Sequence, residues 1–309
     1  MRFWRTPRPC HRAAVGRPAM KIGLAVADFA WEGGAPRMAE TLASISRSAD
    51  DAGFDVIGVA DHVWQGPHMG GPEQPMLECF TTLATIAAHT RRIRVMPLVA
   101  GVHFRSPGLL AKSVTTLNVL SGGRADLGIG AGWYEEEALG LGIPFPPLAE
   151  RFERLEETVR ICRSMWDGER GDEKPFDGVH HRLERALNVP QNLTTPKIMI
   201  GGGGEKKTLR LVARHADACN LYPGPDLTDK LDVLRRHCES EGTDYEAIEK
   251  TCIMPFTAGD AASADELAGV LRGLGGLGVQ RVIGILEGAD QQRQVEVIGE
   301  RVLSAVADA

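Results

Sequence analysis

Short apolar runs rich in β-branched residues alternate with longer amphipathic helical patterns along most of the chain. Eight of these runs have the length and the flanking Gly, Pro or polar turns of strands. They cover residues 21–27, 55–60, 93–100, 124–130, 197–201, 217–221, 250–257 and 279–285. A helical pattern follows each run. The alternation predicts an α/β protein with the (β/α)8 fold of a TIM barrel, and a doubly wound open sheet is the alternative.

The rhythm breaks at one internal segment. Residues 167–196 are punctuated by Gly and Pro and predict an insertion before the fifth strand, with a small hairpin near residues 176–179. Residues 1–19 are rich in Arg and Pro and show no apolar period, so we expect a disordered N-terminal extension. Residues 20–309 show no shift in composition and are expected to form one barrel domain.

The composition favours a soluble enzyme that acts on small molecules. Of the 309 residues, 43% are hydrophobic and 25% are charged, and the net charge is −6. An acidic chain argues against nucleic acid as the main partner, and the apolar runs are too short to cross a membrane. The 6 cysteines lack C-x-x-C spacing and the histidines lack an H-E-x-x-H motif. We therefore expect buried thiols in a reducing cytoplasm and no metal site.

The fifth strand runs into four consecutive glycines, Gly201 to Gly204, where the next helical pattern begins near Glu205. Glycines let the backbone approach a ligand closely, and a helix N-terminus offers free N–H groups and a partial positive charge. This arrangement suits a phosphate group, and a flexible turn without a ligand is the alternative. The stretch does not have the spacing of a Walker A loop.

In a barrel of this kind, functional side chains lie on the loops after the C-terminal ends of the strands. Asp61 and His62 follow the second strand, where His62 can donate a hydrogen bond or a proton and Asp61 can orient it. Capping of the loop is the alternative for this pair. His103 and Arg105 follow the third strand, and Arg105 is equally compatible with a structural pair to a neighbouring carboxylate.

Small residues follow the fourth strand. Gly130, Ala131 and Gly132 allow a flat ligand to approach, and Trp133 and Tyr134 can stack on a ligand or bound a pocket. Three glutamates come next, and a tight turn followed by an acidic helix start is the alternative interpretation.

Taken together, these segments resemble the luciferase-like monooxygenase superfamily of flavin barrels, and in particular its deazaflavin-dependent oxidoreductases. Single pieces are weak evidence, whereas their order and spacing over about residues 20–285 are specific. The segments that carry the resemblance are Asp61-His62 and residues 98–107, 117–124, 127–137, 142–145 and 201–218.

The resemblance implies a (β/α)8 barrel with a flavin-type ring, that of the 5-deazaflavin coenzyme F420, across its mouth. It also implies a non-prolyl cis peptide between Leu98 and Val99 that supports the ring. The backbone after the fifth strand would hold the coenzyme phosphate, with Lys206 as a further partner. The residues implied to bind the coenzyme are Leu98, Val99, Gly101, Gly130, Ala131, Gly132, Gly202, Gly203, Gly204, Glu205 and Lys206.

The implied reaction is hydride transfer between reduced F420 and a small organic substrate, with His62 as the catalytic residue and Asp61 as its partner. Two alternatives remain: a two-component monooxygenase that uses reduced flavin mononucleotide (FMN) and oxygen, and a flavin-binding paralogue without turnover. Sugar-phosphate dehydrogenases of this group carry an acidic residue where this chain has Trp133, which puts a sugar-phosphate substrate in question. The resemblance also implies a homodimer.

Overall fold

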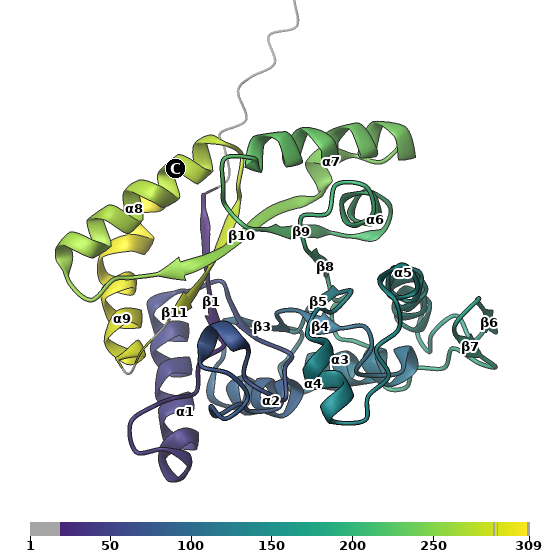
Figure 1. Cartoon of the computed structure of the whole chain (residues 1–309), viewed down its shortest axis with the longest axis horizontal. Helices are drawn as coiled ribbons and strands as arrows, with labels where there is room; N and C mark the ends of the chain where they lie inside the picture. The colour runs from purple at the N-terminus through teal and green to yellow at the C-terminus, as the bar shows by residue number, and fades with distance from the viewer. Residues whose placement is uncertain (1–18, 287, 289, 308–309) are drawn as a thin grey trace, which may run out of the picture.

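The computed structural model describes residues 19–286, 288 and 290–307. Within these residues, nine parallel strands form one sheet that curls into a nearly closed barrel, with helices around it (Figure 1). The sheet order is β3-β2-β1-β11-β10-β9-β8-β5-β4. The strands are β1 (Lys21–Val26), β2 (Val56–Val59), β3 (Arg94–Pro97), β4 (Ala100–Gly101), β5 (Leu127–Gly130), β8 (Ile198–Gly201), β9 (Ala218–Leu221), β10 (Glu249–Phe256) and β11 (Arg281–Leu286).

The helices form the outer layer (Figure 1). In α1 the predicted stripe of Met38, Leu42, Ile45 and Ala49 is buried, and Gly53 ends the helix with a φ of 94°. The main helices are α1 (Ala35–Ala52), α2 (Cys79–His89), α3 (Pro107–Leu120), α4 (Glu135–Gly140), α5 (Leu148–Met165), α6 (Thr208–His215), α7 (Leu227–Glu241), α8 (Ala261–Gly276) and α9 (Gln291–Val297). A π turn (Ile298–Val302) joins α9 to α10 (Leu303–Val306).

The predicted third strand is split into β3 and β4 by a cis peptide bond between Leu98 and Val99. The cis bond implied by the resemblance is therefore present. The two parts lie at opposite ends of the sheet order, so the sheet returns to its starting point. A parallel bridge between Val95 and Ala125 links β3 to the start of β5. This closure is consistent with the predicted TIM barrel.

Two apolar cores hold the barrel. The larger one lies between the strands and the surrounding helices, and the smaller one fills the barrel interior. The smaller core consists of Ala25, Val56, Met96, Leu98, Met199, Ala218 and Ile283. Residues of β1, β2, β3, β8, β9 and β11, together with Leu98, supply it, as expected for a packed barrel interior.

Glycines on neighbouring strands make room for the side chains beside the cis bond. A methyl group built on Gly58 would lie 2.7 Å from Leu98 Cβ. Methyl groups built on Gly130 and Gly201 would lie 3.0 and 3.1 Å from the γ carbons of Val99. Larger residues at these three positions would displace Leu98 and Val99.

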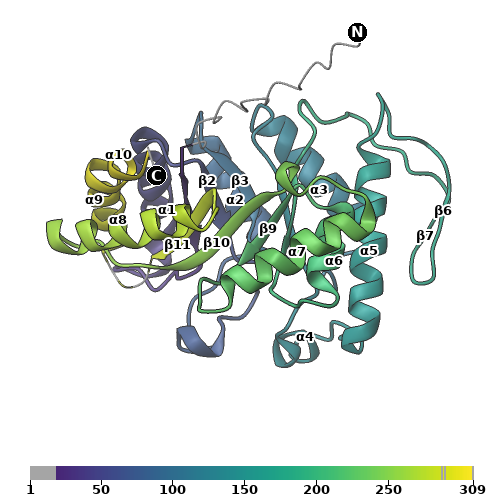
Figure 2. The ribbon, with the colours of Figure 1, turned by 90° about the horizontal axis from the view of Figure 1, so that it is seen from above.

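The segment between α5 and β8 contains a two-stranded antiparallel hairpin, β6 (Phe176–Asp177) and β7 (Arg182–Leu183), which projects beyond α5 (Figure 2). The helix predicted to begin at Glu205 begins at Thr208, because residues 205–207 form turns before it. The prediction for residues 1–19 lies, apart from Ala19, outside the described residues.

The predicted buried thiols are confirmed for the described cysteines. Cys79, Cys162, Cys219, Cys238 and Cys252 are buried and free, whereas Cys10 lies outside the described residues. None of the described helices has the length and apolarity needed to span a bilayer.

Candidate active site at the mouth of the barrel

A cavity of about 750 Å³ opens where the barrel strands end. The loops after β2, β4, β5, β8 and β9 line it, together with the first turns of α5. Because the strands are parallel, their C-terminal ends meet on one side of the barrel, the side on which α4 lies in Figure 2. The sequence predicted functional residues at this end.

His62 lines the cavity and is held by Glu137, a buried residue in the first turn of α4. Glu137 Oε2 lies 2.8 Å from His62 Nδ1. Glu137 Oε1 accepts hydrogen bonds from the backbone amides of Val63 and Trp64 at 2.6 and 2.9 Å. Burial opposes ionisation, but His62 and the two amides hold the pKa of Glu137 below its ordinary value. A carboxylate only accepts hydrogen bonds, so His62 Nδ1 carries the proton and Nε2 is left as an acceptor.

Asp61 contacts Arg105, whereas the sequence suggested that it orients His62. Its Oδ2 accepts a hydrogen bond from Arg105 Nη1 at 2.7 Å and one from the amide of Gly101 at 3.1 Å. Arg105 Nη2 also donates to Glu78 at 2.7 Å. Burial raises the pKa of Asp61, and Arg105 opposes that effect. The sequence was compatible with a structural pair between Arg105 and a neighbouring carboxylate, and this pair is present. Through Asp61 it joins the loop after β2 to the end of β4.

Aromatic rings surround His62. The centroid of Trp133 lies 5.3 Å from that of His62 and 5.9 Å from that of His68. Tyr134 stacks on Trp133 at 4.9 Å. Trp133 is 54% exposed although it lines the cavity, so a ligand can cover it.

His103 also lines the cavity, but its surroundings are apolar. Its ring lies 4.1 Å from Phe104 and 5.0 Å from Phe145, and neither ring nitrogen has a hydrogen-bond partner among the described residues. Burial, together with the charge of Arg151, lowers the pKa of His103 to about 4. The ring is therefore neutral near pH 7.

The glycines after β8 form the part of the cavity wall that can receive an anion. Gly202 has a φ of 120° and donates its amide to Asn220 O at 3.0 Å. Gly203 and Gly204 line the cavity, and their amides have no partner within the described part of the chain. A methyl group built on Gly204 would lie 2.9 Å from Thr208 Oγ1, so glycine keeps this space open.

The lysine beside this loop is Lys230 of α7. A methyl group built on Gly203 would lie 3.2 Å from Lys230 Nζ, and the same Nζ pairs with Asp226 at 2.6 Å. Glu205 and Lys206, which the sequence suggested as phosphate contacts, are exposed and do not line the cavity. The other predicted coenzyme contacts do line it: Leu98, Val99, Gly101, Gly130, Ala131, Gly132, Gly202, Gly203 and Gly204.

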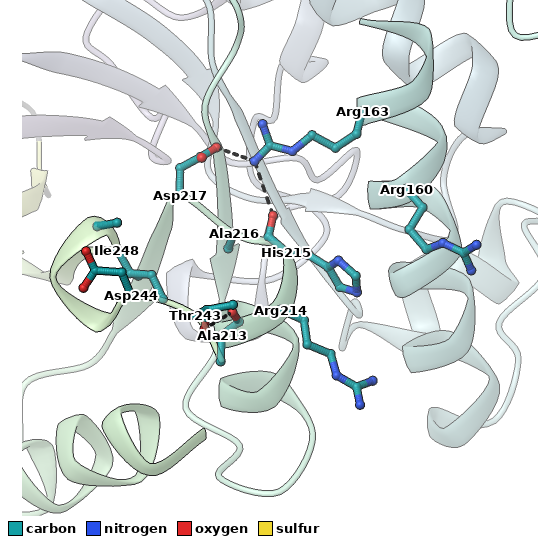
Figure 3. Close-up of a pocket in the computed structure, with 11 residues that line it drawn as sticks. Arg160, Arg163, Ala213, Arg214, His215, Ala216, Asp217, Thr243, Asp244 and Ile248 are labelled. Atoms are coloured by element: carbon teal, nitrogen blue, oxygen red, sulfur yellow. Dashed lines mark hydrogen bonds and ion pairs between the residues drawn. The ribbon is translucent and has the colours of Figure 1, made fainter. Parts of the chain in front are cut away.

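A second cavity, of about 500 Å³, lies before β9 and β10, at the opposite end of the barrel (Figure 3). Figure 3 shows Arg163 bridging Asp217 and the carbonyl of His215, at 2.7 and 3.3 Å. Arg214 pairs with Glu241 at 2.8 Å. These charged groups satisfy one another, and residues at this end of a barrel serve stability more than catalysis.

The profile of the luciferase-like monooxygenase family matches residues 12–300. The chain belongs to this family. Among curated relatives of this luciferase-like chain, a protein of Nakamurella multipartita named F420-dependent glucose-6-phosphate dehydrogenase is 33% identical over 206 residues. The match covers 65% of this chain and 58% of that protein, so the chain spans less than two thirds of the relative's length.

Two solved structures share the fold of the luciferase-like chain. An F420-dependent secondary alcohol dehydrogenase in complex with an F420-acetone adduct superposes with a TM-score of 0.78 at 15% identity, over 93% of this chain and 99% of that one. A monooxygenase from Streptomyces bottropensis superposes with a TM-score of 0.75 at 20% identity, over 92% and 99%.

Sequence reasoning missed two residues of this site. Glu137 was considered only as part of an acidic helix start, although consecutive glutamates on a helix face different directions. Lys230 lies on a later helix, and no spacing connects it to the glycines. For Glu137 an available signal was its place in the first turn of a helix that follows a barrel strand.

Proposed function

We propose that this luciferase-like protein is an oxidoreductase that transfers a hydride between coenzyme F420 and a small organic substrate. The observation that carries the proposal is that two different features line one cavity. One is the His62–Glu137 pair, which suits proton exchange, and the other is the pair of free amides at Gly203 and Gly204, which suits an anionic group.

The residues of the cavity fit this coenzyme. A Cβ at Gly203 or Gly204 would occupy the space beside their backbone amides. These two amides would hold a phosphate, and Lys230 would add a positive charge nearby. The floor from Leu98 to Gly101 offers an apolar surface for a flat ring. When bound, F420 takes up or gives a hydride at one ring carbon, so that oxidation of an alcohol sends the C–H electron pair to the ring and the O–H proton to a base.

His62 is the base in this proposal. Its Nε2 takes the proton from the substrate hydroxyl during oxidation and returns it during reduction. Glu137 fixes the tautomer through Nδ1 and stabilises the protonated ring, since its carboxylate lies 2.8 Å away. Asp61 serves as a positioning residue, because with Arg105 it holds the amide of Gly101 in the cavity floor.

The choice of F420 over FMN is supported by the relatives about 30% identical to this chain, which are named F420-dependent dehydrogenases. Titration of the purified protein with each coenzyme tests it. We expect tight F420 binding and weak FMN binding. Tight FMN binding without F420 binding would refute the choice, and a product that gains an oxygen atom from O₂ would favour the two-component monooxygenase instead. Binding of F420 without turnover of any substrate would favour the non-catalytic paralogue.

We also propose that the hairpin segment before β8 is the insertion before the fifth barrel strand. The protein is further proposed to act as a homodimer in the cytoplasm. Size-exclusion chromatography with light scattering tests the dimer, and a monomeric mass would refute it.

A further inference from the structure

The two ends of the cavity differ in what lies behind their lining: lysines stand behind the glycine end, and aromatic rings line the end around His62. No Lys or Arg is found among the cavity-lining residues in the described part of the chain. Near the glycines after β8, however, two lysines stand directly behind the lining. Lys230 Nζ lies 3.2 Å from a methyl group built on Gly203, and Lys207 Nζ lies 5.4 Å from the ring centre of Phe152, which lines the cavity. The glycine end can therefore hold the anionic part of a coenzyme.

The end around His62 is aromatic, and apart from Tyr134 the ionisable side chains that line it are carboxyl groups and histidines. Trp133, Tyr134 and His68 lie around His62, and Met69 lines the same region. The carboxyl groups that line this end are Asp61 and Glu137. Both carboxyl groups already have partners, Asp61 with Arg105 and Glu137 with His62.

Two arginines lie behind this end without lining the cavity, and Arg151 keeps its Nε without a hydrogen-bond partner among the described residues. Arg105 donates to Asp61 and to Glu78. Arg151 donates to Pro146 O at 2.8 Å, and its guanidinium carbon lies 3.8 Å from the ring centre of Phe145. Neither arginine lines the cavity, so neither supplies the missing cation.

On the basis of the proposed hydride transfer, we infer that the substrate is an uncharged alcohol or carbonyl compound with an apolar or aromatic body, and not a phosphorylated sugar. A phosphate dianion loses its hydration when it enters a protein site, and bidentate Arg contacts, Lys ammonium groups or free backbone amides replace that water. The His62 end offers aromatic rings and the Nε2 atom of His62 in their place. A hydroxyl group can meet His62 Nε2 while an apolar body covers Trp133.

The inference separates this chain from the dehydrogenase named for glucose 6-phosphate to which it is similar. The sequence resemblance implies an acidic residue in sugar-phosphate dehydrogenases at the position of Trp133, whose ring is 54% exposed in this chain. An aromatic ring therefore stands at that position here.

The test is a titration of tryptophan fluorescence in the full-chain protein, both loaded with F420 and free of coenzyme. The probes are 1-phenylethanol, acetophenone, glucose and glucose 6-phosphate. Glucose is the matched control because it differs from glucose 6-phosphate only by the phosphate. The Trp133→Phe variant identifies the part of the signal that arises at the His62 end.

We expect 1-phenylethanol and acetophenone to bind the loaded protein at least about tenfold more tightly than glucose 6-phosphate, and glucose 6-phosphate to bind no better than glucose. Tighter binding of glucose 6-phosphate than of glucose overturns the inference, and so does the absence of binding by both aromatic probes. If F420 itself does not bind, the proposed function fails. In that case the dissociation constants of the four probes, measured by the Trp133 fluorescence of the coenzyme-free protein, still decide the substrate class.

Discussion

Glu137 Oε2 lies 2.8 Å from Nδ1 of His62, while the other oxygen of the same carboxylate accepts two successive backbone amides. One buried group thus fixes both the histidine ring and the loop that carries it. The orientation of the proposed base depends on a contact between two segments that are 75 residues apart in the chain.

Replacement of Glu137 by Gln should lower kcat by about 100-fold, because the neutral amide neither fixes the tautomer of His62 nor stabilises its protonated form. The affinity for F420 should change little. The rates are to be measured against pH with the Glu136→Gln variant as control, since Glu136 is an exposed neighbour on the same turn. A kcat within about threefold of the wild type would remove Glu137 from the mechanism.

The Arg105→Gln variant should lose about 3 kcal/mol of unfolding free energy, because it leaves the carboxylate of Asp61 buried without its partner. The double variant Asp61→Asn with Arg105→Gln should recover part of that loss, since no charge remains to be buried. Urea denaturation of both variants measures the coupling. Equal stability of the single and double variants would contradict the structural role given to this pair.

Lys230→Met should weaken F420 binding by about three- to tenfold and reduce the salt dependence of binding, because it removes a positive charge beside the proposed phosphate contacts. Lys206→Met serves as the matched control and should change the affinity by less than twofold. Isothermal titration at two salt concentrations distinguishes the lysines. A larger loss of F420 affinity in Lys206→Met than in Lys230→Met would favour Lys206 as the phosphate partner, as the sequence suggested.

Gly202 and Gly203 should respond differently to substitution by Ala. Gly202→Ala should cost about 1–2 kcal/mol of stability, because φ at this position is 120°. Gly203→Ala should fold with near-normal stability, since its Cβ would meet only the flexible end of Lys230, but it should bind F420 more weakly. Thermal unfolding and coenzyme titration are measured on both variants. Normal coenzyme affinity in Gly203→Ala would argue against the phosphate site.

His103 should make the coenzyme-free protein less stable as the pH falls from 6.5 to 4. The pKa of this group is about 4 in the folded chain, against 6.5 as its ordinary value. In that pH window the unfolded chain therefore binds a proton that the folded chain does not, and stability falls with pH. After allowance for solvent screening of a partly exposed ring, the loss is about 1–2 kcal/mol.

The His103→Phe variant should lack this loss, whereas His89→Gln should keep it because His89 is exposed at the end of α2. Urea denaturation at pH 7 and pH 5 gives the comparison. An identical change in stability for the wild type and His103→Phe would show that the ring titrates normally.

The periodicity of the sequence predicted the strands and helices well, because each barrel strand is apolar and each helix buries one stripe. It did not show that the third strand is split, since Leu98 and Val99 continue an apolar run, and only the family resemblance pointed to a cis bond there. His62 was found because it follows a strand. Its partner could not be derived from spacing, because Glu137 approaches it only after the barrel closes.

The glycines that face Leu98 and Val99 restrict how this protein can diverge. A side chain added at Gly58 would clash with Leu98, and one added at Gly130 or Gly201 would press tightly on Val99, so point changes there have little freedom. His68 and Met69 lie in a short 3-10 helix (Pro67–Met69) and Trp133 lies in the loop after β5, and all three line the cavity outside the barrel strands. Diversification of substrate preference, in nature or in a laboratory library, should therefore concentrate on rim residues while the floor stays constant.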